Sequence, residues 1–120
     1  FAALRADVDD RDRHVLLGVR AETSSLVEVA GMSEGTADQL YLALRIASLE
    51  RHLERHAPIP FILDDILVNF DDARATAALD VLAALSERTQ VIYFTHHQHL
   101  VELAKTKVGE KTLFVHALNR

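Results

Sequence analysis

The chain of 120 residues contains no cysteine, which excludes a disulfide framework and a thiolate-bound metal. This absence fits a protein of the cytoplasm, the location that we expect. No apolar run approaches the length of a membrane span, and the first residues do not form a signal-peptide pattern. We therefore expect no membrane among its partners.

A strongly basic composition is also missing. The formal net charge of −5 argues against a protein whose whole surface binds nucleic acid, although a local basic patch is compatible with it. Hydrophobic residues make up 49% of the chain, which indicates a globular fold. No repeat or linker interrupts residues 1–120, and the chain begins abruptly at Phe1, so we expect a single partial domain.

The most informative stretch is Pro60-Phe61-Ile62-Leu63-Asp64-Asp65. Its apolar run predicts a strand buried on both faces, as in the centre of a parallel sheet. Asp64 and Asp65 follow at the carboxyl end, where open α/β sheets bind ligands. Carboxylates there are costly to desolvate unless they bind a cation or a water. A solvated Asp-Asp turn is the simpler alternative.

Strand and helix patterns alternate along the rest of the chain. Residues 1–14, rich in aspartate, predict a solvated turn. The apolar patterns then predict strands over 14–20, 26–29, 91–94 and 112–116, helices over 36–56 and from Asp71 or Asp72 to 88, and a third helix with Leu100, Val101, Leu103 and Ala104. The expected fold class is α/β, a mostly parallel sheet flanked by helices, with an N-terminal β-hairpin.

The first predicted helix begins after a Ser-x-Gly turn, Ser33-Glu34-Gly35. Thr36 and Gln39 match a capping box, so Thr36 is the expected N-cap. Free backbone N–H groups and the positive end of the helix dipole suit an anion such as phosphate. Serine and glycine also begin many helices that bind nothing, and both interpretations stay open at this point.

Polar residues also follow the next predicted strand. Thr95 and His96 come directly after residues 91–94. Neighbouring parallel strands lie about 4.8 Å apart, so we expect these residues close to Asp64 and Asp65. A nucleoside triphosphatase needs this combination: one carboxylate for Mg²⁺, a second for the attacking water and a histidine near the phosphate.

Together these motifs resemble the C-terminal half of an ABC-type ATPase head of the SMC-like class. Four motifs carry the resemblance in the family's order, namely the ABC signature, a Walker B strand, the D-loop aspartate and the switch-histidine loop, at residues 32–36, 61–65, Asp71 and Thr95-His96. The stretch from Ser33 to Arg45 is most similar to YhaN-like AAA-domain proteins, long-coiled-coil relatives of DNA-repair SMC ATPases. The resemblance covers residues 15–118.

The resemblance implies a role for each matched residue and implies ATP and Mg²⁺ as cofactors. Asp64 would hold Mg²⁺ through water, and Asp65 would take the place of the general base. His96 would sense the γ-phosphate. The wider family has glutamate at the position of Asp65, and aspartate is one methylene shorter, so we expect slow turnover.

Other residues would act across a dimer of two heads. Ser33 and Gly35 would contact the γ-phosphate on the opposite head, and Asp71 would reach across the interface. Gln39 and Arg45 would support the signature from the helix behind it. The implied partners are a second head and the N-terminal lobe of the same parent protein. DNA is implied by the resemblance alone, since nothing in the acidic sequence indicates it.

The sequence contains no G-x-x-x-x-G-K-[ST] motif, the Walker A loop that binds phosphates. In SMC-like ATPases this loop belongs to an N-terminal lobe that a long coiled coil separates from the C-terminal one. We therefore expect the chain to hydrolyse ATP only as part of a parent ATPase and to be inactive alone. Exposed apolar surface is expected where the other lobe packs.

Two further functions remain open. Imidazole and carboxylate suit Zn²⁺ or Mn²⁺, so a metal-dependent phosphohydrolase or nuclease is one alternative. Its residues would be Asp64, Asp65, His96, His97 and His99. Otherwise His97 and His99 begin the third helix in solvent, and His52 and His56, four apart, form a solvated helix face. The other alternative is a non-catalytic interaction module.

Overall fold

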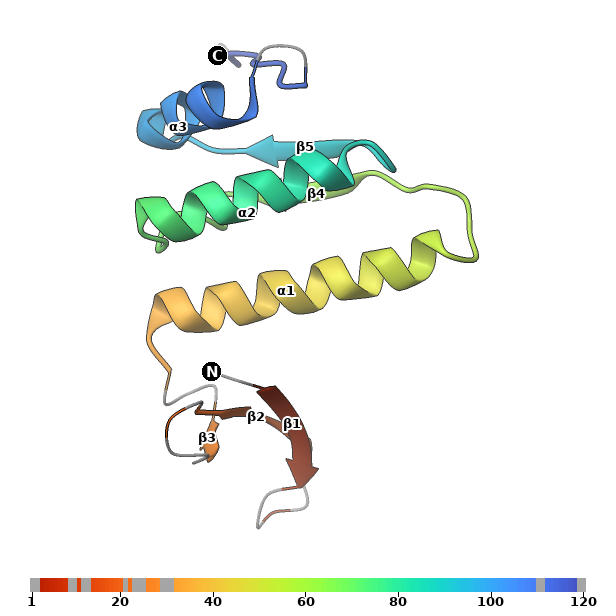
Figure 1. Cartoon of the computed structure of the whole chain (residues 1–120), viewed down its shortest axis with the longest axis vertical. Helices are drawn as coiled ribbons and strands as arrows, with labels where there is room; N and C mark the ends of the chain where they lie inside the picture. The colour runs from red at the N-terminus through yellow and green to blue at the C-terminus, as the bar shows by residue number, and fades with distance from the viewer. Residues whose placement is uncertain are drawn as a thin grey trace. The chain divides into compact units, whose positions relative to one another are not determined.

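The computed structural model describes residues 3–8, 11, 14–20, 22, 26–28, 32–109 and 112–118. The chain forms two compact units, residues 1–37 and residues 38–120, and each is described by itself. Figure 1 shows the course of the chain through three strands, a long helix, and then alternating strands and helices. In the described part of the chain, no helix is both long enough and apolar enough to cross a membrane.

The first unit contains an antiparallel sheet in the order β1-β2-β3. Its strands are β1 (Ala3–Val8), β2 (His14–Val19) and β3 (Leu26–Glu28). The predicted hairpin is confirmed by the β2–β3 pair, in which Val19 lies opposite Leu26. The prediction of a solvated turn over 1–14 is wrong for residues 3–8, which pair with β2 from Ala3–Val19 to Val8–His14.

The signal for β1 is present in the sequence but is masked by charge. Leu4, Ala6 and Val8 alternate with Arg5 and Asp7, the period-2 pattern of a strand. The density of aspartate in residues 7–12 conceals this pattern, because aspartate favours turns. Residues 9–10, 12–13 and 23–25, where we expected turns, lie outside the described residues.

Helix α1 (Glu34–Leu53) begins in the first unit and continues into the second. The cap is Ser33, not Thr36 as predicted: the Ser33 Oγ accepts a hydrogen bond from the Thr36 backbone N–H at 3.2 Å. Thr36 is the third helical residue, and its Oγ1 accepts a bond from the Ser33 hydroxyl at 2.8 Å. The helix also ends before His56, because Arg55 N–H bonds to His52 O in a turn.

Helix α1 buries less of its surface than its sequence predicts. Leu42 and Leu49 are buried, and Ile46 and Leu53 are partly buried against the core. The helical spacing of these residues, widened by Leu40, Leu44 and Ala47, predicts an extensively buried helix, yet Ala47 is exposed. The predicted extensive burial of this helix is therefore wrong for the isolated chain.

The second unit is built on two parallel strands, β4 (Phe61–Asp64) and β5 (Val91–Phe94). Phe61 pairs with Val91, and Asp64 pairs with Phe94. Helix α2 (Asp72–Leu85) connects the two strands, and α3 (Gln98–Val108) follows β5. This order confirms the α/β prediction and the parallel sheet. Val91 and Tyr93 of β5 are partly buried against the core. The buried apolar side chains of the core come from α1, β4, the loop after β4, α2 and α3: Leu42, Leu49, Phe61, Leu63, Leu67, Ala75, Ala78, Leu82, Leu85 and Leu100.

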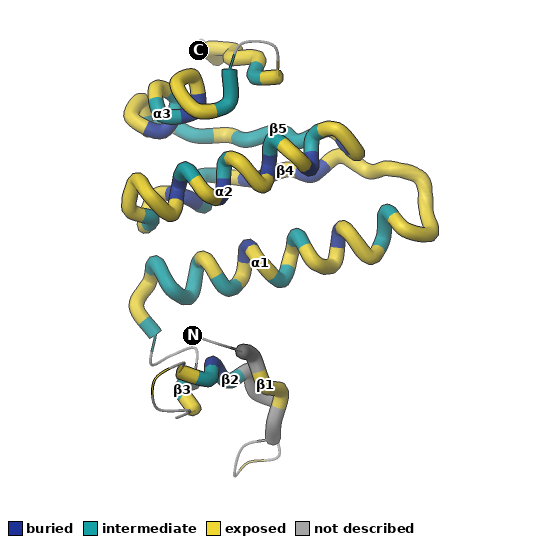
Figure 2. The backbone as a smooth tube through the Cα atoms, in the orientation of Figure 1, coloured by how far each residue is buried: buried dark blue, intermediate teal, exposed yellow. Residues whose placement is uncertain are grey.

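The two faces of β4 differ. Phe61 and Leu63 are 7% and 0% exposed, whereas Ile62 between them is 52% exposed. Figure 2 shows how buried and exposed positions alternate along α1 and α2. The prediction of a strand buried on both faces is therefore wrong for this chain. The expected exposed apolar surface is confirmed in the second unit by Tyr41, Ile59, Ile62, Val68, Val81 and Phe94. What covers it remains a prediction.

The predicted last strand over 112–116 is wrong. Thr112 lies in a turn and residues 113–118 are irregular. Phe114 and Leu118 are 75% and 80% exposed. A strand requires a neighbouring edge to satisfy its backbone groups, and no described strand pairs with this segment.

Candidate functional site

Asp65 is the residue at which the chain leaves β4. Its φ of 53° lies in the left-handed region, which aspartate tolerates better than most side chains. Its backbone N–H donates to Phe94 O at 2.7 Å, which continues the pairing with β5 by one step. This sharp change of direction places the Asp65 side chain beside the residues that follow β5.

Three residues after β5 converge on the Asp65 carboxylate. The Thr95 hydroxyl donates to Oδ1 at 2.6 Å. The Oδ2 atom lies 3.1 Å from His96 Nδ1 and 3.2 Å from His97 Nε2. The prediction that Thr95 and His96 lie next to the aspartates at the end of β4 is thus confirmed for Asp65.

The site is shielded at the carboxylate and open at the imidazoles. The side chain of Asp65 is 16% exposed, whereas that of His96 is 82% exposed and that of His97 is 38% exposed. The two rings lie 4.3 Å apart between centroids and are tilted by 34°. The carboxylate is therefore shielded and held by Thr95, while most of the His96 ring is exposed.

His97 was named only in the metal-dependent alternative, and the ATPase interpretation left it in solvent at the start of α3. The structure places its Nε2 beside Asp65. It occupies the N-cap position without a side-chain capping bond. N-caps are usually Ser, Thr, Asp or Asn, so a histidine there is the one signal that its side chain has another partner. His99, in contrast, contacts Asp72 at 2.7 Å.

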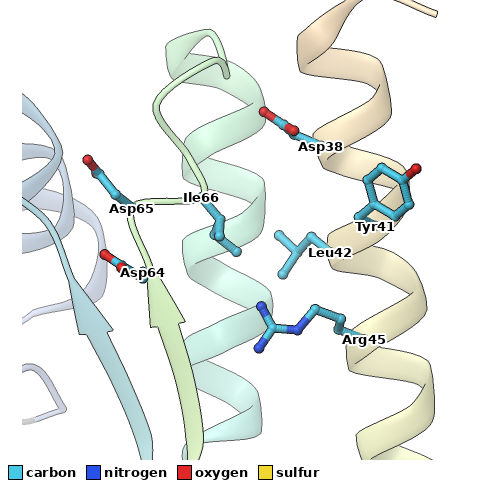
Figure 3. A pocket seen from close by; sticks show the side chains of 7 residues that line it. All are labelled: Asp38, Tyr41, Leu42, Arg45, Asp64, Asp65 and Ile66. Atoms are coloured by element: carbon cyan, nitrogen blue, oxygen red, sulfur yellow. The ribbon is translucent and has the colours of Figure 1, made fainter. Parts of the chain in front are cut away.

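Asp64 lies next to Asp65 but has a different environment. Its side chain forms no hydrogen bond or ion pair within the part of the chain that is described. Both aspartates line an open pocket of roughly 230 Å³, together with Asp38, Tyr41, Leu42, Arg45 and Ile66. In Figure 3 both aspartate side chains point away from α1. An exposed carboxylate of this kind suits a hard cation such as Mg²⁺.

Tyr93 connects the loop after β4 to β5. Its hydroxyl accepts a hydrogen bond from the Leu67 backbone N–H at 3.0 Å. Burial raises the pKa of Tyr93 above its ordinary value, and the negative charges of Asp65 and Asp64 raise this pKa further. The phenol is therefore held neutral beside the two carboxylates.

Asp71 is the N-cap of α2, one of the two caps that we predicted. Its Oδ1 accepts from the Arg74 backbone N–H at 2.8 Å, and its Oδ2 lies 3.8 Å from Arg74 Nε. The side chain is 64% exposed. It is accessible to a partner, and its contacts with Arg74 are local to α2.

The remaining predicted residues lie on α1 and before it. Ser33 and Gly35 are in the first unit, where Ser33 caps the helix and Gly35 is in its first turn. Arg45 donates to Ile62 O at 3.0 Å, and its guanidinium lies 5.0 Å from the Phe61 ring centroid. Arg45 therefore holds β4 against α1. Gln39 is exposed.

Comparisons with known proteins agree with this architecture. No family model matches the chain. It is 44% identical over 70 residues to the uncharacterized protein YhaN of Bacillus subtilis (strain 168), a match that covers 58% of this chain and 7% of that protein. The chain therefore spans a small part of the length of that relative.

A solved structure has a similar fold. It comes from a study of ATP-driven dimerization and DNA-stimulated activation of SMC ATPases, and it matches with a TM-score of 0.63 and 19% identity. The match covers 84% of this chain and 61% of that chain. The predicted resemblance is therefore confirmed, in sequence for YhaN and in fold for SMC ATPases.

Proposed function

We propose that this chain is the C-terminal lobe of an ATP-hydrolysing head of the SMC-like class. The observation that carries the proposal is the convergence of Thr95 and His96 on Asp65, at the carboxyl ends of adjacent parallel strands. A shielded carboxylate beside an exposed imidazole is an arrangement suited to orient a water next to a phosphate. The fold shared with an SMC ATPase supports this assignment.

The residues of the site have distinct roles in this proposal. The Thr95 hydroxyl holds Asp65 Oδ1, so Oδ2 is the oxygen that accepts a proton from the attacking water. His96, whose side chain is 82% exposed, turns toward the γ-phosphate. The exposed carboxylate of Asp64 fits a Mg²⁺ site, and this ion would neutralise the charge of the phosphates of ATP.

The proposal includes two partners, an N-terminal lobe with the Walker A loop and a second head. ATP binds with the Walker A loop of an N-terminal lobe of the parent. Ser33, Gly35 and Asp71 act across a dimer of two heads, as the ATP-driven dimerization studied for the solved SMC ATPase suggests. By the same analogy, the parent acts in DNA repair or maintenance, and DNA added to the assay should accelerate hydrolysis.

Hydrolysis of Mg·ATP is the direct test, measured with this chain alone and with the N-terminal lobe of the parent added. Activity is expected only with both lobes. Asp65→Asn should lower the rate by about 10²- to 10⁴-fold, the usual contribution of a general base. Ser33→Arg should leave ATP binding intact and stop turnover. Asp80→Asn, a change at an exposed position of α2, is the matched control.

Two results would contradict the proposal. Full hydrolysis by the Asp65→Asn variant would contradict the role of Asp65 as the general base, and no hydrolysis even with both lobes present would favour a non-catalytic interaction module. Hydrolysis of a phosphate ester by the chain alone with Zn²⁺ or Mn²⁺, indifferent to Ser33→Arg, would favour the metal-dependent hydrolase. The structure restricts that alternative to Asp65, His96 and His97, because His99 pairs with Asp72.

A further inference from the structure

Asp65 and two histidines beside it have the composition of a metal site. The ligand atoms of Asp65, His96 and His97 all lie within 4.8 Å of one another. We propose that these residues bind a divalent transition metal, with Zn²⁺ as the best fit, and that this metal inhibits the site. Imidazole with one carboxylate is a ligand set that suits zinc and leaves a fourth position for water.

The distances around Asp65 already approximate those of a zinc site. Bonds of about 2.0–2.1 Å in a tetrahedral site place neighbouring ligand atoms about 3.4 Å apart. Asp65 Oδ2 lies 3.1 Å from His96 Nδ1 and 3.2 Å from His97 Nε2. All three ligand atoms lie within 4.8 Å of one another, and the 82% exposed ring of His96 has room to turn toward an ion shared with Oδ2.

Thr95 orients two of the three ligands. Its hydroxyl donates to Asp65 Oδ1 at 2.6 Å, and its Oγ1 accepts from the His97 backbone N–H at 3.1 Å. One side chain thus fixes the carboxylate and the backbone that carries His97. Hydrogen bonds of this kind from outside the ligand set orient ligands and strengthen metal binding.

The inhibition follows from which atoms the metal would occupy, and this part of the inference rests on the proposed function. Asp65 Oδ2 cannot accept a proton from water while it binds zinc. His96 cannot turn to a phosphate while its Nδ1 is a ligand. Zinc and ATP hydrolysis would therefore exclude each other.

Another histidine pair must be prevented from binding zinc if the test is to be clear. His52 and His56 stack at 4.8 Å between centroids on the last turn of α1 and the residues after it, and such a pair can bind zinc weakly. We therefore place His56→Gln in every protein of the experiment. His99→Gln, which removes a histidine that pairs with Asp72 outside the cluster, is the matched control.

The first measurement is calorimetric titration of the chain with zinc chloride, in the absence of ATP. We expect one zinc per chain, with affinity unchanged by His99→Gln and lowered at least about 100-fold by His97→Gln. Thr95→Val should lower it by about 10-fold, as for other changes outside the ligand set. If circular dichroism shows that His97→Gln is unfolded, His96→Gln at the 82% exposed position replaces it.

The metal site would be overturned if the chain with His56→Gln alone and the folded His97→Gln or His96→Gln variant bound zinc with equal affinity, whatever the ATPase assay shows. The second measurement is the inhibition of Mg·ATP hydrolysis by zinc, each variant relative to its own zinc-free rate. Inhibition that tracks the zinc affinities supports the full proposal. Zinc binding without inhibition keeps the site but overturns its regulatory role.

Discussion

The connection from β4 to α2 spans residues 65–71 and is anchored along its length, whereas the connection from β5 to α3 spans only residues 95–97. The first contains Leu67, 1% exposed, and forms bonds to Tyr93 and, through Asn69, to Asp38. The second contains no large buried side chain, and its side chains contact Asp65.

The two connections are therefore expected to serve different purposes, the first in stability and the second in binding and turnover. The first connection fixes the backbone around Asp65 through the core, so its substitutions should alter the free energy of unfolding. The second supplies polar side chains with much exposed surface, so its substitutions should alter binding and turnover. The following substitutions test this division, from the largest expected effect on stability to the smallest.

Leu67→Ala should be the most destabilising change. Leu67 is among the most buried large side chains of the described residues, and removing such a side chain leaves a cavity that costs about 2–5 kcal/mol. Urea unfolding measures the effect. Val68→Ala, at the neighbouring position that is 47% exposed, should cost less than about 1 kcal/mol. Similar losses at both positions would contradict the assignment of Leu67 as the anchor.

Tyr93→Phe should cost about 1–3 kcal/mol, because the Leu67 N–H loses its acceptor in a partly buried place. It should also alter the response to pH. The folded protein raises the pKa of Tyr93 above its ordinary value of 10.0. The contribution of the neutral phenol to the free energy of unfolding is therefore fully present below pH 10.0 and is lost as the pH rises through the pKa of the folded state.

Urea unfolding as a function of pH checks this second effect. The decline in stability above a pH of about 10 should be weaker in Tyr93→Phe than in the parent chain. Tyr41→Phe, at a position that is 51% exposed, serves as the control and should leave the decline unchanged. An identical decline in all three proteins would exclude the proposed burial of the phenol.

Asp71→Ala should cost about 1 kcal/mol, since it removes the side chain that caps α2. Thermal unfolding detects this change, and Asp80→Ala within the same helix is the control for loss of charge. If Asp71→Ala had no effect, the cap would contribute nothing, and the exposed Asp71 would be available only for a partner.

His97→Ala should alter stability least, by less than about 0.5 kcal/mol, because His97 makes no capping bond at the start of α3. The same variant should lose zinc binding if the metal proposal is correct. A large destabilisation, measured by urea unfolding, would show that the second connection is anchored through His97 and would remove the contrast between the two connections.

Much of this contrast could be read from the sequence. Continuous apolar runs over 61–63 and 91–94 predicted both strands, and the polar residues after them predicted a shared site. The burial of Ala75, Ala78, Leu82 and Leu85 on α2 also follows from their helical spacing. These features are local, because each depends on residues within a few positions of one another.

Other features depend on contacts between distant segments and could not be read in this way. Whether residues 112–116 form a strand depends on a neighbouring edge, and whether Ile62 is buried depends on what covers the second face of β4. The N-cap of α1 was predicted three residues late because Ser33 and Thr36 both have capping side chains, and only the hydrogen bond to Ser33 Oγ distinguishes them.

The sequence by itself determined the order of the elements and the polar character of the strand ends, since apolar periodicity and turn residues act over short distances. The tertiary structure decided which polar groups meet. Asp65 turns toward β5 because its backbone adopts a left-handed conformation and bonds to Phe94. His97 contacts Asp65 while His99, two residues later, contacts Asp72, because successive residues at the start of a helix point in different directions.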